Sequence, residues 1–173
     1  MDASTALQAA RLGETGGEIA LEGHDVIHQA ILALVQQACD RVLILSPRLD
    51  TRLFGSRELA SILSSLLRAH RRAHGRILVQ DAAALAREGH PLLDLARRLS
   101  SHLEIRRLPE EQAALGETWV LVDEAGLMRM PHPERYAGTA CFHAPQAVRE
   151  LTQEFAALWE AAGPDPNLRR LHL

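Results

Sequence analysis

The chain has 173 residues, of which 47% are hydrophobic and 24% are charged, and its formal net charge is −3 at pH 7. These values predict one globular domain with a sizeable core, and they argue against a dedicated polyanion-binding protein, which usually carries a strong basic excess. All 19 residues counted as lysine or arginine are arginines. Mechanisms that require a lysine amine, such as Schiff-base formation, are therefore excluded.

The sequence shows no signal for export, membrane insertion, disulfide bonding or metal binding. Its first residues lack the cationic and apolar segments of a signal peptide, and its longest aliphatic runs have only strand length, so we expect a cytoplasmic protein. Two cysteines, Cys39 and Cys141, are too few for a disulfide framework or a zinc pattern. His70 and His74 have the spacing of helical zinc ligands, but no third ligand is evident, so we expect neither a metal nor a cofactor.

The predicted elements alternate between helix and strand. In the first half we expect a flexible arm or short helix over 1–17, a strand over 18–21, a helix capped by Asp25, a strand over 42–46, a helix from Ser56 to Gly75 and a strand over 76–80. In the second half we expect a helix from Pro91, a strand over 103–108, a hairpin over 117–131, a strand over 139–142 and a helix from Pro145 to Gly163.

This order predicts an α/β domain over residues 18–163, with one mixed sheet, helices on both of its faces and a C-terminal tail over 164–173. The long crossover connections favour parallel pairing of the first central strands. In such sheets, ligands bind outside the carboxyl ends of the strands. The segments 46–52 and 81–90, which we interpret as loops after two of these strands, are therefore a candidate binding surface.

Three groups of polar residues are candidates for ligand binding. They are Arg48, Asp50 and Arg52; Asp81, Arg87 and His90; and Arg129, His132, Arg135 and Tyr136. Guanidinium groups in the first group could bind phosphate or carboxylate, or could pair with acids inside an exposed loop. The second group could line the same cleft or cap the following helix. The third follows the hairpin, where His132 is the candidate general base if the segment is not simply a surface loop.

Several stretches resemble the phospholipase D-like superfamily, which is an α/β/α sandwich. They are Arg-Val-Leu-Ile-Leu-Ser at 41–46, Val-Gln-Asp at 79–81, Val-Leu-Val-Asp-Glu-Ala-Gly at 120–126 and Gly-Thr-Ala-Cys-Phe at 138–142. More narrowly, Ser-Pro-Arg-Leu-Asp at 46–50 and Pro-Asp-Pro-Asn-Leu-Arg-Arg-Leu at 164–171 resemble an uncharacterised bacterial domain of this superfamily. That domain occurs alone or appended to acetyltransferase-like domains of the GNAT type.

Active members of the resembling superfamily carry a His-x-Lys pair followed, after four residues, by Asp. Placing Asp123 at the Asp puts Gly116 at the histidine and Thr118 at the lysine. Glycine supplies no nucleophile and threonine supplies no positive charge, although phosphodiester cleavage needs both. The resemblance therefore implies the fold without its usual activity, and hence a catalytically inactive binding or assembly module that recognises an anionic ligand through arginine-rich loops.

Two other functions stay open at this stage. One is a phosphodiesterase or hydrolase with a site rebuilt around His132, Arg129, Arg48 and Asp81, and the other is an anion-binding sensor. The resemblance also implies a homodimer, because active members assemble two such units, and a protein partner or an acetyltransferase-like domain is a further candidate. We interpret the basic stretch of Arg68, Arg71, Arg72 and Arg76 as a solvated surface, so we expect no binding of nucleic acid or membranes.

Overall fold

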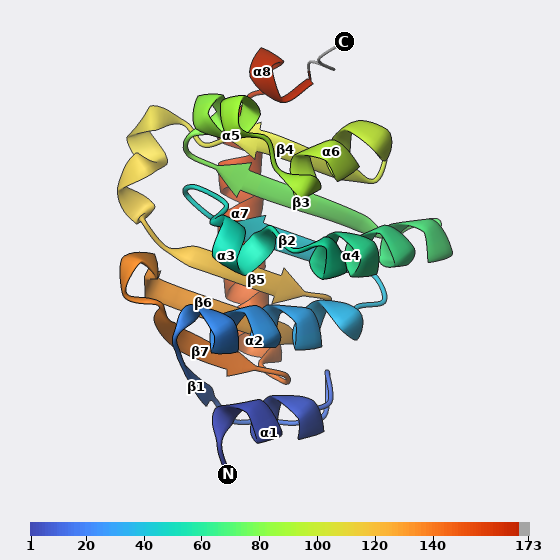
Figure 1. Ribbon diagram of the computed structural model, residues 1–173, viewed down its shortest axis with the longest axis vertical. Helices are drawn as coiled ribbons and strands as arrows, with labels where there is room; N and C mark the ends of the chain where they lie inside the picture. The colour runs from blue at the N-terminus through green and yellow to red at the C-terminus, as the bar shows by residue number, and fades with distance from the viewer. Residues whose placement is uncertain (170–173) are drawn as a thin grey trace.

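The computed structural model describes residues 1–169, except for the side chains of residues 113–115. Its centre is a mixed sheet of seven strands in the order β1-β7-β6-β5-β2-β3-β4, with helices on both faces (Figure 1). The predicted α/β class is therefore confirmed. The strands are β1 (Ile19–Glu22), β2 (Arg41–Leu45), β3 (His74–Val79), β4 (Leu103–Arg107), β5 (Thr118–Val122), β6 (Gly126–His132) and β7 (Ala137–Cys141).

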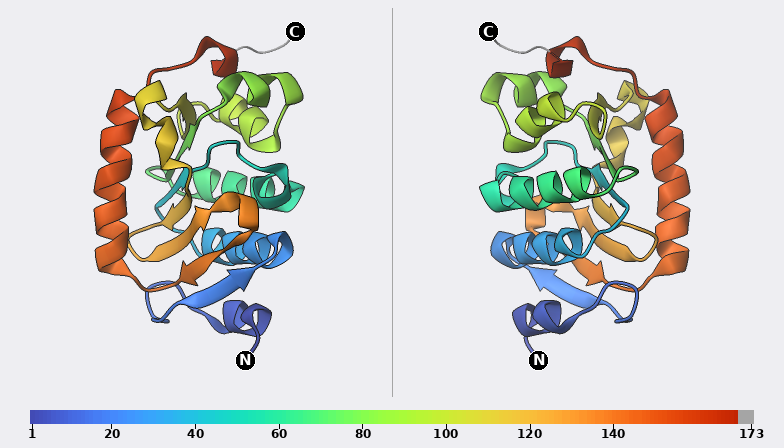
Figure 2. Two further views of the ribbon diagram at one scale, coloured as in Figure 1. Left: turned by 90° about the vertical axis from the view of Figure 1, so that its left-hand side faces the viewer. Right: turned by 90° about the vertical axis from the view of Figure 1, so that its right-hand side faces the viewer.

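The helices divide between the two faces of the sheet. The α-helices are α1 (Ala3–Ala9), α2 (His24–Gln36), α3 (Thr51–Phe54), α4 (Arg57–Ala69), α5 (Ala82–Glu88), α6 (Pro91–Arg98), α7 (Pro145–Ala161) and α8 (Pro166–Arg169), and the 3-10 helices are η1 (Glu110–Leu115) and η2 (Pro133–Arg135). The long helix α7 covers one face, and α2, α4 and α6 cover the other (Figure 2). In the described part of the chain, no helix combines the length and the apolar character needed to cross a bilayer.

Strand pairing determines which segments meet at the edge of the sheet. The strands β2, β3 and β4 pair in parallel, as the crossover lengths predicted, whereas β5 pairs with β2 in the antiparallel direction. Leu45, the last residue of β2, pairs with Leu78 of β3 and with Trp119 of β5. The carboxyl ends of β2 and β3 therefore lie beside the amino end of β5.

The sheet separates two apolar clusters. Because side chains alternate along a strand, Val42 and Ile44 of β2 pack toward α2 and α4, whereas Leu43 and Leu45 pack toward α7. Trp159 anchors α7 in the second cluster. Its ring lies 5.0 Å from the guanidinium carbon of Arg76 and 4.3 Å from that of Arg106, so two cation–π contacts hold it on β3 and β4.

Two predicted helix boundaries are wrong. Gly23, and not Asp25, precedes α2, and Asp25 lies in the first turn, where its carboxylate still complements the helix dipole. The helix that was expected to reach Gly75 ends at Ala69, and Gly75 lies inside β3. A Cβ atom at residue 75 would lie 2.7 Å from Cδ1 of Leu103, so the glycine allows this leucine to pack closely on the strand.

The N-terminal segment packs against the rest of the domain. Of the two expectations for residues 1–17, the short helix is observed as α1, with Leu7 buried. The main-chain N–H of Leu12 donates to Oε1 of Gln37 at 2.9 Å, and that of Gly13 donates to the carbonyl of Phe142 at 2.7 Å. The domain limits at residues 17 and 163 stay predictions, and the tail is described only as far as Arg169, with 170–173 outside the described residues.

Asp123, in the turn between β5 and β6, lies beside the start of β2, at the end of the sheet away from the cleft. It has a left-handed backbone, with a φ of 53°. Its carboxylate accepts hydrogen bonds from the main-chain N–H groups of Cys39, Asp40 and Arg41, at 2.9, 2.8 and 3.0 Å. The residue that the resemblance places in a catalytic motif thus joins the hairpin to the start of β2.

We expect Asp123→Asn to lower the free energy of unfolding by about 2 kcal/mol, because an amide cannot accept three N–H donors as a carboxylate does. Asparagine tolerates a positive φ, so the change tests the carboxylate and not the backbone. Urea denaturation measures the loss. The exposed neighbour Glu124, changed to glutamine, is the matched control and should alter stability by less than about 0.5 kcal/mol. Equal effects of the two changes would contradict this role of Asp123.

Candidate functional site

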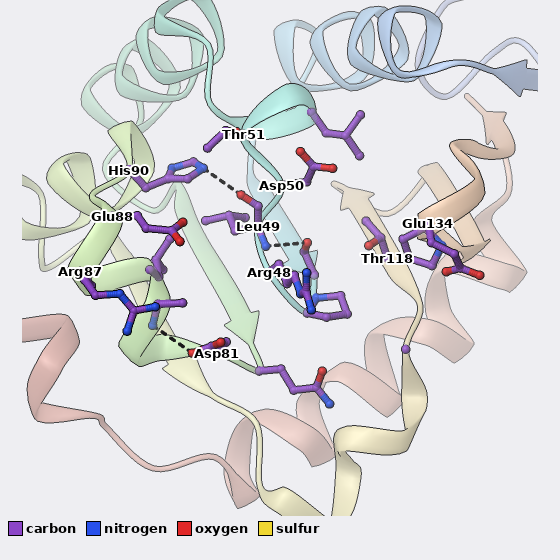
Figure 3. A pocket seen from close by; sticks show the side chains of 18 of the residues that line it. Arg48, Leu49, Asp50, Thr51, Asp81, Arg87, Glu88, His90, Thr118 and Glu134 are labelled. Atoms are coloured by element: carbon purple, nitrogen blue, oxygen red, sulfur yellow. Dashed lines mark hydrogen bonds between the residues drawn. The ribbon is translucent and has the colours of Figure 1, made fainter.

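A cleft of about 880 Å³ opens where β2 and β3 end and β5 begins (Figure 3). This volume lies in the range of small-molecule sites. The cleft is bordered by the segments that follow β2 and β3, by the start of β5 and by η2. Its charged lining residues are Arg48, Arg87, Asp50, Asp81, Glu88 and Glu134. The surface is therefore polar and of mixed charge.

The segments that follow β2 and β3 are not the loops that the sequence predicted. The stretch 47–52 includes the start of α3, and the stretch 81–90 contains α5. Each helix begins after an aspartate that caps it: Asp50 accepts from the N–H of Arg52 and Asp81 from that of Ala84, both at 2.9 Å. These caps hold the two carboxylates at the cleft.

Leu49 sets the course of the chain as it leaves β2. It is fully buried and has a φ of 51°, a left-handed conformation that is uncommon for a leucine. Its N–H donates to Oγ of Ser46 at 3.0 Å, and its carbonyl oxygen lies 3.0 Å from Nε2 of His90. Since these bonds hold the buried residue, its neighbours Arg48 and Asp50 are directed to the cleft.

His90 is a neutral, structural histidine. It is 3% exposed, and its Nδ1 accepts from the N–H of Leu92 at 3.1 Å, so its proton resides on Nε2 and is donated to Leu49. Burial lowers the pKa of His90, although the bond to the Leu49 carbonyl and the nearby Asp94 carboxylate oppose that shift. The residue caps α6, which is the alternative the sequence left open, and neither ring nitrogen is available as a general base.

Tyr136 and Asp50 close one side of the cleft. The Tyr136 hydroxyl donates a short hydrogen bond to Oδ2 of Asp50. This bond raises the pKa of Tyr136, burial adds to the rise, and the neighbouring Arg52 partly opposes it. Tyr136 has a φ of 47°, so two of the three non-glycine residues with positive φ in the described chain, Leu49 and Tyr136, line the cleft. Such backbone strain is concentrated at functional sites.

The structure brings six of the ten candidate residues together. Those that line the cleft are Arg48, Asp50, Asp81, Arg87, His90 and Tyr136. Of the other four, Arg52 lies beside Tyr136, and Arg135 is exposed on η2. The remaining two, Arg129 and His132, are the residues on which the hypothesis of a rebuilt active site depends.

Arg129 and His132 lie outside the cleft lining. Arg129 forms an ion pair with Glu117 at 3.1 Å and is opposite Trp119 in the sheet, so it projects to the face that α7 covers. His132 is exposed, with its Nδ1 3.9 Å from Oε1 of Glu134. These two residues therefore do not meet Arg48 and Asp81 in one cleft.

Other polar residues also border the cleft. Ser46 and Glu88 lie within the candidate segments 46–52 and 81–90, whereas Thr118 and Glu134 were not predicted as ligand-binding from the sequence. Gly116, which the resemblance places at the catalytic histidine, borders it with Thr118. Among the described residues, the guanidinium groups of Arg48 and Arg87 have no hydrogen-bond or ion-pair partner, so both remain available to a ligand.

The neutral state of His90 predicts a pH-dependent stability. Because its pKa is lowered in the folded chain, this histidine contributes fully above its ordinary pKa of 6.5, and the contribution is lost as the pH falls below that value. We expect the unfolding free energy to fall between pH 7.5 and 5.5, and less steeply in His90→Asn, which keeps a cap for α6. Thermal unfolding at both pH values measures this. His70→Asn, at an exposed site, should keep the slope of the unaltered chain, and an equal slope in both variants would contradict the assignment.

Comparison with known proteins agrees with this architecture. The model of the family described as "Domain of unknown function (DUF7931)" matches residues 23–171. No protein of curated function matches the sequence. Similar solved structures do exist, and the identities to them are low, so they show the fold alone.

Three similar structures span different kinds of protein. TrmBL2, an archaeal chromatin protein described with a novel mode of DNA binding, has a TM-score of 0.62 at 13% identity over 84% of this chain and 52% of its own. NucT from Helicobacter pylori has 0.57 at 10% over 86% and 99%. Nuc from Salmonella typhimurium, a phospholipase D family member, has 0.53 at 9% over 77% and 86%. This chain spans about half the length of TrmBL2. The phospholipase D-like fold expected from the sequence is confirmed.

Proposed function

We propose that this chain, which belongs to the DUF7931 family of domains of unknown function, binds a small anionic ligand in its cleft and does not cleave phosphodiesters. The observation that carries the proposal is the presence of Gly116 and Thr118 in the cleft lining. At these positions the resemblance expects a histidine nucleophile and a lysine. The cleft is thus retained, while the groups that would react in it are replaced.

The remaining side chains support a binding role over a catalytic one. Of the chain's nine histidines, His90 lines the cleft, and both of its ring nitrogens are engaged by the protein itself. His132, the candidate base of the rebuilt site, lies outside the lining. The sequence contains no lysine that could stabilise a phosphoryl transition state. On this basis the chain is a degenerate member of the superfamily.

The charges at the cleft favour a small ligand over a polyanion. The available guanidinium groups of Arg48 and Arg87 can bind phosphoryl or carboxylate oxygens through paired N–H donors. Glu88 and Glu134 border the same cleft and would repel the phosphates of an extended strand. They could accept hydrogen bonds from hydroxyl or amino groups of a small phosphorylated molecule. The homodimer and the acetyltransferase-like partner implied by the resemblance stay predictions, and analytical ultracentrifugation tests the first.

The binding proposal is tested by thermal shift and calorimetry with inorganic phosphate, adenosine monophosphate and a short single-stranded oligonucleotide. We expect phosphate or the monophosphate to raise the melting temperature, because they bind only the folded state. Arg48→Ala should raise the Kd about tenfold, since a charge-assisted hydrogen bond is lost. Arg71→Ala, at an exposed arginine outside the cleft, is the control. Tighter binding of the oligonucleotide, or equal effects of the two variants, would contradict the proposal.

The absence of catalysis is tested separately with bis(p-nitrophenyl) phosphate, single-stranded DNA and phospholipid vesicles. We expect no product above a no-protein control, because among the described residues no free imidazole lines the cleft to attack phosphorus or to activate a hydroxyl group. Turnover that is lost in His132→Ala would favour the rebuilt site. Turnover that is lost in Asp81→Asn but kept in His132→Ala would indicate a hydrolase in the cleft itself. Either result would overturn the non-catalytic part of the proposal.

A further inference from the structure

The lining of the cleft contains a threonine hydroxyl group without a protein partner. Thr118 is 2% exposed and lines the cleft. Its main chain pairs with Met130 in the sheet, but within residues 1–169 no group forms a hydrogen bond with its hydroxyl. The Thr118 oxygen itself is not fully buried, because the fully buried, unpaired side-chain oxygen of the described chain is that of Thr152. An unpaired hydroxyl that a largely buried residue presents to a cleft can form a hydrogen bond with a ligand that enters from solvent.

A second hydroxyl lies across from Thr118. Leu45 of β2 pairs with Trp119 of β5, so the next positions in this register are Ser46 and Thr118, which share one face of the sheet. Ser46 is 3% exposed and also lines the cleft. Its Oγ accepts the N–H of Leu49, but its own proton is donated to no described residue. Two neighbouring hydroxyl donors are therefore available at the inner end of the cleft.

Gly116 keeps the approach to Thr118 open. A Cβ atom at residue 116 would have no atom within 4 Å, so that position borders empty space. The next side chain, Glu117, does not fill it, because its carboxylate is held by Nε1–H of Trp119 at 2.6 Å and by the guanidinium of Arg129. A ligand group can thus reach the Thr118 hydroxyl without displacing a side chain.

We infer that the Thr118 hydroxyl, together with that of Ser46, donates hydrogen bonds to the oxygens of a phosphoryl group whose outer side is bound by Arg48. This inference rests on the proposed function and assigns the inner end of its anion site. Phosphoryl groups fit this arrangement, because three acceptor oxygens can be shared between hydroxyl donors on one side and a guanidinium on the other. Figure 3 shows Thr118 and Arg48 among the side chains around the cleft.

The test compares Thr118→Val with Thr152→Val. The Thr152 hydroxyl is unpaired as well, but it is fully buried and belongs to α7 on the other face of the sheet. Without ligand, neither change removes a hydrogen bond within the described chain, so we expect neither to lower the melting temperature. With inorganic phosphate or adenosine monophosphate, only Thr118→Val should raise the Kd, by about tenfold. Thr118→Ser keeps the hydroxyl and should keep the affinity within about threefold.

Each outcome decides the matter. A lower melting temperature of free Thr118→Val would overturn the inference, because the hydroxyl would then have a structural partner. If Arg48→Ala weakens binding but Thr118→Val does not, the inference fails while the proposed function stands. If the unaltered chain binds neither phosphate nor the monophosphate, the proposed function fails and the inference fails with it. Selective loss of binding in Thr118→Val, restored in Thr118→Ser, supports both.

Discussion

The cleft depends on one constrained residue, Leu49, whose left-handed backbone turns the chain as it leaves β2. The Ser46 hydroxyl and the His90 ring hold this conformation from two sides. Asp50 then follows, capping α3 and accepting the Tyr136 hydroxyl. Hydrogen bonds thus run from α6 through the turn to η2, around most of the cleft. Because this framework forms without a ligand, the side chains that face the cleft are pre-organised for binding.

Much of the sheet could be predicted because its strands are marked by local composition. Buried parallel strands such as 42–45 are continuous aliphatic runs, and the hairpin around Asp123 carries a clear turn. The short helices α3 and α5 were missed, since elements of one or two turns show too little periodicity to be recognised. Their caps, Asp50 and Asp81, were instead interpreted as loop residues.

The site residues that follow strand ends could be predicted from the sequence. Those whose position depends on which strands pair, and in which register, could not. Arg48 and Arg87 were found because parallel strands bring the segments that follow them to one edge. The prediction that Arg129 lies at the cleft was wrong. Side chains alternate along β6, so Arg129 projects with Trp119 to the opposite face of the sheet. Thr118 and Ser46 could not be found as a pair, because a single sequence does not say that β5 lies beside β2.

The pairing of β1 with β7 has a consequence for how the protein folds during its synthesis. Residues 19–22 enter the sheet by pairing with residues 137–140, so β1 can join the sheet only once β7 is present. Until the ribosome has made β7, β1 has no strand to pair with, and the side of the cleft that contains Tyr136 has not formed. Contacts of such long sequence separation form slowly. The sheet can therefore close only after β7 has been synthesised, and until then the nascent chain exposes aliphatic strands that chaperones can bind.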